Sequence, residues 1–187
     1  MTKTELRKKY KALRKALSLE VIESQSLAIA NQLLKLPIWD NIYYHLFLSI
    51  TEHNEVQTEF ILHILHAKDK EVIISKSDFK TCDLINYLLT DNTVIKKNTW
   101  GIPEPVDGIT VNNSKIDVVF VPLLAFNKEG HRVGYGKGFY DNFLSKCKPE
   151  TIKIGLSFFD AEETIEGIIE SDVTLDYCVT PKTIYTF

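Results

Sequence analysis

The sequence predicts a three-layer α/β fold in which a mostly parallel sheet carries helices on both faces. Amphipathic helical segments alternate with short apolar segments rich in β-branched residues, as where residues 56 to 67 are followed by EVIIS at 71 to 75. The run DVVFVP at 117 to 122 is apolar and β-branched, which is typical of a strand buried inside a parallel sheet. The short connections between such segments favour one sheet covered by helices.

Composition indicates one globular domain spanning residues 1 to 187. Hydrophobic residues make up 44% and charged residues 25% of the chain, and the net charge of −3 gives no general attraction to nucleic acid. No apolar stretch is long enough to span a bilayer, so we expect a cytoplasmic protein without a membrane partner. The three cysteines form no CxxC pair, which indicates reduced thiols.

Two helices and a buried strand are predicted in the first 50 residues. Apolar side chains recur at helical spacing between residues 6 and 17, with lysines and arginines on the other faces. Ser18 is a favoured N-cap for a second helix that runs to about residue 36, where Pro37 ends it. The run YYHLFLSI at 43 to 50 then predicts a strand.

The rest of the chain continues the alternation of strands and helices. In order, we expect a helix at 56 to 67, strands at 71 to 75 and 117 to 122, a helix from about residue 137 to 147, a strand at 152 to 158, and short closing strands at 177 to 180 and 183 to 187. Ligands of such sheets bind at the carboxyl ends of the strands.

The segment HRVGYGKGFYD at 131 to 141 lies at that edge of the predicted sheet. Its alternating glycines allow tight turns and leave backbone N–H groups uncovered, while Arg132 and Lys137 add positive charge. Asp141 falls in the first turn of the following helix, where a carboxylate can reach a Mg²⁺ ion that bridges phosphates. The segment therefore suits ATP or another phosphorylated ligand, although it matches neither GxxxxGK[ST] nor GxGxxG. The alternative is a flexible glycine turn with incidental charges.

Longer stretches of the chain resemble one enzyme family. RVGYGKGFYDNFL, preceded by DVVFVPLLAFNKEGH and by WGIPEP at 100 to 105, resembles 5-formyltetrahydrofolate cyclo-ligases, and KTELRKKY resembles their opening helix. The resemblance runs from Lys3 to about Thr180. It implies a monomeric enzyme with a three-layer Rossmann-like fold. Its reaction turns 5-formyltetrahydrofolate and ATP into 5,10-methenyltetrahydrofolate, ADP and phosphate, with Mg²⁺, through phosphorylation of the formyl oxygen.

The resemblance also implies roles for individual residues on the nucleotide side. The ATP-binding residues are Lys3 and Arg7 of the first helix with Arg132, Val133, Gly134, Tyr135, Gly136, Lys137, Gly138, Phe139 and Tyr140 of the loop. Arg132, Lys137 and Tyr140 are the catalytic candidates. Asp141 and Asp172 correspond to the magnesium carboxylates, with Glu170 and Asp176 as alternatives to Asp172.

On the folate side, the stretch FLSITEHNEVQT at 47 to 58 resembles the segment that lines the pterin pocket. The implied substrate-binding residues are Phe47, Leu48, Glu55, Trp100 and Tyr140. Glu55 is the expected partner of the pterin N–H donors, but a few extra residues between Ser49 and Glu55 leave Glu52 as an alternative.

Two other classes of function stay open at this point. The scaffold also resembles those of sugar-phosphate isomerases and CoA transferases, which would use the anion-binding loop for another ligand. A non-enzymatic nucleotide-binding protein would bind ATP without turnover. Without the family resemblance, the basic residues of the first helix would be interpreted as a solvated face.

Overall fold

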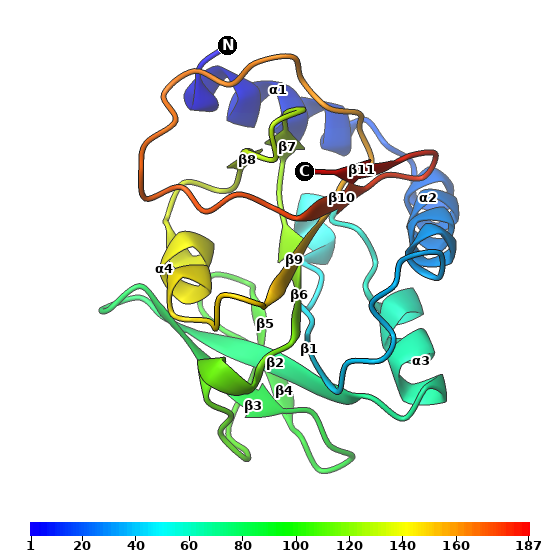
Figure 1. The fold of residues 1–187 in the computed structure, drawn as a ribbon, viewed down its shortest axis with the longest axis vertical. Coiled ribbons are helices and arrows are strands. Elements are labelled where there is room, and N and C mark those ends of the chain that lie inside the picture. The colour runs from blue at the N-terminus through cyan, green and yellow to red at the C-terminus, as the bar shows by residue number, and fades with distance from the viewer.

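The computed structural model describes all 187 residues, and its elements are shown in Figure 1. The helices are α1 (Lys3–Lys15), α2 (Leu19–Leu33), α3 (Glu59–Ala67) and α4 (Phe139–Ser145), with short 3-10 turns η1 (Thr51–His53) and η2 (Asn113–Lys115). The strands are β1 (Tyr43–His45), β2 (Glu71–Asp78), β3 (Asp83–Leu88), β4 (Ile95–Lys97), β5 (Pro103–Pro105), β6 (Val118–Pro122), β7 (Ala125–Phe126), β8 (Arg132–Val133), β9 (Ile152–Leu156), β10 (Tyr177–Val179) and β11 (Ile184–Thr186). No helix has both the length and the apolar character required to cross a membrane.

A seven-stranded sheet in the order β11-β10-β9-β6-β1-β2-β3 forms the centre of the fold. The five inner strands pair in parallel, and both edge strands, β11 and β3, pair antiparallel to their neighbours. The mostly parallel sheet predicted from the sequence is therefore confirmed. The parallel pairing places the carboxyl ends of β1, β2 and β6 at the same end of the sheet.

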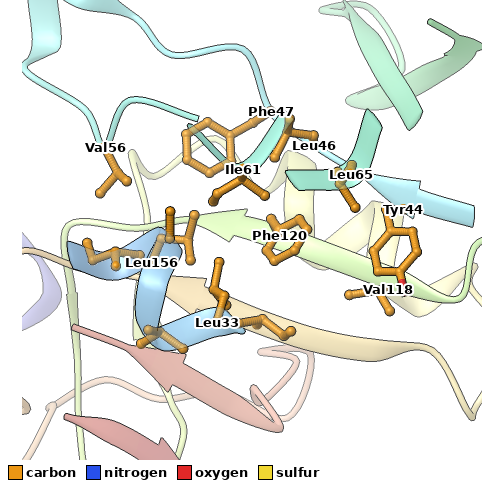
Figure 2. Close-up of a cluster of buried hydrophobic side chains, with 14 of the residues drawn as sticks. Leu33, Tyr44, Leu46, Phe47, Val56, Ile61, Leu65, Val118, Phe120 and Leu156 are labelled. Atoms are coloured by element: carbon orange, nitrogen blue, oxygen red, sulfur yellow. The ribbon is translucent and has the colours of Figure 1, made fainter. Parts of the chain in front are cut away.

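Both faces of the sheet are covered, as predicted, and β6 shows why its sequence is apolar throughout. Val118 and Phe120 belong to a core cluster that includes residues of α2 and α3 (Figure 2). Val119 and Val121 face the other way, into a cluster that contains Phe143 of α4. All four of these β6 side chains are fully buried, so alternation along the strand contributes apolar surface to each layer.

The helix boundaries follow from local chemistry. Thr2 and Glu5 form a reciprocal capping box at the start of α1, and the Ser18 hydroxyl accepts a hydrogen bond from the N–H of Val21 at the start of α2. α2 ends at Leu33, about three residues before the predicted limit, because the residues that precede Pro37 turn away from helical geometry. α4 begins at Phe139 instead of Lys137, since Gly138 has a left-handed φ of 74°.

One departure from the prediction lies in residues 43 to 50, of which only Tyr43–His45 pair as a strand. Beyond Leu46 the chain leaves the sheet, and side-chain hydrogen bonds replace the ladder: the Thr58 hydroxyl donates to the carbonyl oxygen of Phe47 at 2.7 Å. α3 starts at Glu59, three residues after the predicted start at residue 56. This non-helical, non-strand segment forms one wall of the site described below.

Candidate functional site

A cavity of about 1010 Å³ opens at the carboxyl ends of the central strands, where the fold class places ligands. It brings together α1, the segment after β1, the glycine loop and the loop that precedes β10. The predicted site residues that border it are Lys3, Arg7, Phe47, Leu48, Glu55, Trp100, Arg132, Gly134, Tyr135, Gly136, Lys137, Gly138, Phe139, Tyr140, Asp141 and Asp172. The exception is Val133, whose side chain is fully buried in the core cluster beneath α1.

The glycine loop needs its glycines for two different reasons. Gly136 has a φ of 94° and Gly138 a φ of 74°, in the left-handed region that other residues rarely adopt. At Gly136 a side chain would also press on Arg7, because an added Cβ would lie 3.1 Å from the guanidinium carbon. Arg7 Nε in turn donates to the carbonyl oxygen of Gly134 at 2.9 Å. The loop is thus packed directly against α1.

Lys137 stands at the exposed mouth of the cavity among aromatic side chains. Its Nζ lies 5.0 Å from the ring centroid of Phe79 and 4.8 Å from that of Trp100, within cation–π range. Phe79 also packs edge-on against Phe139 at 5.2 Å. Lys137 has no carboxylate partner, so its charge is available to an anionic ligand.

Arg132 lies deeper and is held by the protein itself. Its Nη2 donates to Asp141 Oδ1 at 2.8 Å, and its Nη1 donates to the carbonyl oxygen of Val173. Burial lowers the pKa of Arg132, an effect opposed by the charge of Asp141, and the group stays a cation. Arg132 therefore joins Asp141 to the segment that carries Asp172, in addition to bordering the cavity.

Asp172, and not Asp176, occupies the cavity wall. Burial opposes ionisation of Asp172, but the ion pair with Lys3 and the N–H of Ile169, at 2.9 Å, outweigh it and lower the pKa of the carboxyl. Asp176 instead accepts from the N–H of Lys153 on β9 at 2.7 Å and does not border the cavity. Glu170 borders the cavity as an exposed side chain.

The two aspartates suit a magnesium ion that is shared with phosphates. Each uses one oxygen for protein contacts, Oδ1 in Asp141 and Oδ2 in Asp172, and the other oxygen accepts no hydrogen bond from the protein. No group of three His, Cys, Asp or Glu side chains is arranged to hold a metal alone. Mg²⁺ commonly takes one or two carboxylates and completes its shell with water and phosphate oxygens, so this donor set fits.

The structure separates Glu55 from Glu52. Glu55 is 4% exposed, borders the cavity, and accepts from the Tyr135 hydroxyl at 2.5 Å and from the N–H of Ile50 at 2.8 Å. Glu52 is exposed, lies outside the cavity, and pairs with Lys97 at 2.5 Å. Of the two acids, only Glu55 is placed to meet a ligand in the cavity.

Tyr140 borders the cavity, where the charges of both Glu55 and Arg132 act on its hydroxyl. Burial and, to a smaller extent, the negative charge of Glu55 raise the pKa of Tyr140 well above its usual range. Its hydroxyl is therefore a neutral hydrogen-bond donor at physiological pH. The ring packs edge-on against His45 at 6.0 Å and Phe143 at 6.1 Å, which fixes its direction.

His45 borders the cavity but gave no signal in the sequence, where it sits inside an apolar run. It is completely buried, and its Nε2 lies 2.7 Å from the Ser75 hydroxyl. The Ser75 hydroxyl donates its proton to Asn86 Oδ1, so it must accept a hydrogen bond from His45 Nε2. The other ring nitrogen of His45, Nδ1, has no hydrogen-bond partner in the protein. Burial lowers the pKa of His45 to about 3, so the imidazole stays neutral.

We expect the free energy of unfolding to depend less on pH in a His45→Gln variant than in the wild type. Below about pH 6.5 the unfolded chain protonates this histidine and the folded chain does not, so stability is lost as pH falls toward about 3. From about pH 7.5 to about pH 5.5 this linkage amounts to about 1.4 kcal/mol. Urea unfolding at the two pH values measures it.

The matched control for this prediction is His63→Gln, which alters an exposed histidine on α3. It should keep the pH dependence of the wild type. An identical pH dependence in the His45→Gln and wild-type proteins would contradict the prediction.

Comparisons with known proteins point to one enzyme family. The 5-formyltetrahydrofolate cyclo-ligase family matches residues 1–181. A mouse 5-formyltetrahydrofolate cyclo-ligase is 30% identical over 150 residues, which cover 76% of this chain and 73% of that protein. A probable 5-formyltetrahydrofolate cyclo-ligase of Caenorhabditis elegans is 30% identical over 189 residues, which cover 93% of this chain and 90% of that protein. The NMR structure of Aquifex aeolicus 5,10-methenyltetrahydrofolate synthetase superposes with a TM-score of 0.82 at 31% identity, covering 100% of this chain and 93% of that one.

Proposed function

The chain belongs to the 5-formyltetrahydrofolate cyclo-ligase family, and we propose that it converts 5-formyltetrahydrofolate and ATP to 5,10-methenyltetrahydrofolate, ADP and phosphate. One observation carries the proposal. The same cavity is bordered by the cations of α1, the glycine loop, two aspartates and the buried acid Glu55. A site for ATP alone has no need of Glu55. A site for a pterin alone has no need of the α1 cations, the glycine loop or the two aspartates.

ATP is assigned to the half of the cavity between α1 and the glycine loop. Lys3 and Arg7 are four residues apart on one face of α1, and Lys137 carries an unpaired charge at the cavity mouth. Such cations, with uncovered backbone N–H groups of the loop, stabilise the charge that spreads over the phosphates during transfer.

Asp141 and Asp172 are assigned to Mg²⁺, which when bound would neutralise charge on the phosphate oxygens. Arg132 contributes by holding Asp141 through Nη2 and the loop before β10 through the carbonyl oxygen of Val173. We therefore assign it a positioning role as well as a positive charge near the phosphates.

Folate is assigned to the half of the cavity that contains Glu55. Its carboxylate can accept the N–H groups of a pterin ring, since each of its oxygens has a further lone pair. Phe47, which is 8% exposed, and Leu48 supply apolar walls, and Trp100, which is 64% exposed, can cover the ring from the cavity mouth. Tyr140 lies where the two halves meet and can donate to the formyl oxygen or a phosphate.

The chemistry follows from this arrangement. The formyl oxygen attacks the γ-phosphorus of ATP, and the bond from that phosphorus to the bridging oxygen of ADP breaks. N10 then attacks the activated formyl carbon and loses its proton, and phosphate departs with the former formyl oxygen. Phosphorylation makes a poor leaving group into a good one, and holding N10 near the carbon removes most of the entropic cost of the second step.

The proposal is tested by mixing purified protein with 5-formyltetrahydrofolate, ATP and Mg²⁺ and following the near-ultraviolet absorbance of the methenyl product. We expect a rise that requires ATP. A folded protein that binds ATP but gives no rise would favour a non-enzymatic nucleotide-binding role. A monomeric state and a cytoplasmic location, both expected from the sequence, stay predictions.

A further inference from the structure

Tyr135 belongs to the glycine loop, but its side chain is held by two other parts of the protein. Its ring packs against the ring of His53, with centroids 5.3 Å apart, and Lys11 Nζ of α1 lies 5.8 Å from its centroid. Its hydroxyl is bonded to Arg14 of α1 and to Glu55. A residue from the nucleotide half of the cavity therefore touches the acid assigned to the folate half.

The direction of each hydrogen bond at this hydroxyl is fixed by chemistry. A guanidinium group only donates, so Arg14 Nη1 donates to the Tyr135 oxygen at 2.9 Å. The single proton of the hydroxyl is then directed to Glu55 Oε1 at 2.5 Å, a charge-assisted hydrogen bond. Burial and the charge of Glu55 raise the pKa of Tyr135, so the phenol keeps that proton.

Both neighbours of this hydroxyl are themselves anchored. Arg14 is 4% exposed, and its Nη2 donates to the carbonyl oxygen of Leu123. Asn54, in the segment that carries Glu55, donates through Nδ2 to the carbonyl oxygen of Arg14 at 2.9 Å. The second oxygen of Glu55 accepts from the N–H of Ile50 at 2.8 Å. The Tyr135 hydroxyl thus links α1 to the segment that carries Glu55.

The loop around Tyr135 has no comparable restraint of its own. Gly134 and Gly136 flank it and carry no side chains that could pack, and Gly134, Gly136 and Gly138 leave the backbone many conformations. Arg7 donates to Gly134 and packs against Gly136, and Cys82 Sγ donates to the carbonyl oxygen of Lys137 at 3.6 Å. Within this part of the loop, Tyr135 supplies the side-chain contact with Glu55.

We infer that Tyr135 is a positioning residue that couples the two substrate sites, an inference that rests on the proposed function. A pterin bound to Glu55 fixes the carboxylate, which fixes Tyr135 and hence the loop in its nucleotide-binding conformation. By linkage, nucleotide bound to the loop must then favour folate binding at Glu55 by the same factor. On the α1 side, Arg14 holds the Tyr135 hydroxyl in place through its hydrogen bond.

The experiment measures the dissociation constant of 5-formyltetrahydrofolate with and without saturating Mg²⁺ and a non-hydrolysable ATP analogue. In the wild type we expect the analogue to tighten folate binding by a factor within about 5 to 150. In Tyr135→Phe we expect this factor to fall close to one. Steady-state kinetics should show the KM for folate raised about tenfold, with a smaller change in kcat, because Glu55 loses a charge-assisted donor.

Tyr10→Phe is the matched control, because the Tyr10 hydroxyl also donates to a glutamate, Glu162, at 2.8 Å, but outside the cavity. Both variants lose a tyrosine–glutamate hydrogen bond, and Tyr135→Phe also loses the bond from Arg14. Urea unfolding of both variants shows how far lost stability accounts for any difference. Only Tyr135→Phe should lose the coupling. Arg14→Met removes the anchor from the other side and should lower the coupling too, so the inference stays testable if one variant fails to fold.

The inference is overturned if Tyr135→Phe keeps the wild-type coupling factor, or if the wild type itself shows no coupling. These results are distinct from failure of the proposed function. A wild type that forms methenyl product but shows no coupling counts against the role of Tyr135 alone. A wild type that forms no product counts against the proposed reaction.

Discussion

Replacing Asp141 by asparagine is expected to lower kcat by about 10²- to 10³-fold, the usual loss when one preorganised electrostatic group is removed from an active site. The carboxylate both accepts from Arg132 at 2.8 Å and keeps a free oxygen toward the cavity. Asparagine preserves its size but not its charge, so the Mg²⁺ concentration required for half-maximal rate should rise as well. Initial rates over a Mg²⁺ titration measure both effects.

Asp83→Asn provides the control for this prediction. Asp83 also forms an ion pair with a residue at the α4 end, Lys146, but the pair is exposed and neither residue borders the cavity. We expect this variant to retain the kcat and the Mg²⁺ requirement of the wild type. If Asp141→Asn did the same, the assignment of this carboxylate to Mg²⁺ would be wrong.

Glu55→Gln is expected to raise the KM for 5-formyltetrahydrofolate by about 10- to 100-fold, since hydrogen bonds to a charged group are worth about 1.5–3 kcal/mol each. The Tyr135 hydroxyl and the N–H of Ile50 both donate to Glu55 and need an acceptor. In the variant, one of them would face the NH₂ group of glutamine, which is itself a donor. The dissociation constant of ATP measured without folate should change much less. Steady-state kinetics with folate varied and ATP binding in the absence of folate measure the difference.

Glu52→Gln tests the alternative acid directly. Glu52 is exposed and pairs with Lys97 outside the cavity, and such surface pairs contribute little. We expect a KM for folate equal to that of the wild type. A raised KM in the Glu52 variant together with an unchanged one in the Glu55 variant would reverse the assignment.

The fold was predictable where the sequence pattern reports burial directly. The strand at 117 to 122 is apolar because both of its faces are covered, and the helices α1 and α2 have strong caps. The antiparallel edge strand β3, with the sequence DLINYL, was not predicted because it mixes polar and apolar residues and has only one fully buried side chain. The two-stranded pairs β4–β5 and β7–β8 are too short to give a periodic signal.

The site was predictable only in part, because several of its contacts join residues that are far apart in the sequence. The glycine loop has a local signature, and the family resemblance supplied Lys3, Arg7 and Asp172, which are far from it in sequence. Nothing local shows that Tyr135 meets Glu55, because 80 positions separate them. Nor does any pattern show that Arg132 is engaged by Asp141 and the Val173 carbonyl. Such pairings arise from the tertiary fold.

The central claim is that ATP activates the formyl oxygen of the folate in this cavity, and an isotope experiment tests it most directly. The substrate would carry ¹⁸O in its 5-formyl group, and the inorganic phosphate released during turnover would be analysed by mass spectrometry. The account predicts that the label appears in phosphate, one labelled oxygen for each methenyl product formed. Methenyl product formed with ATP consumption but with unlabelled phosphate would contradict it.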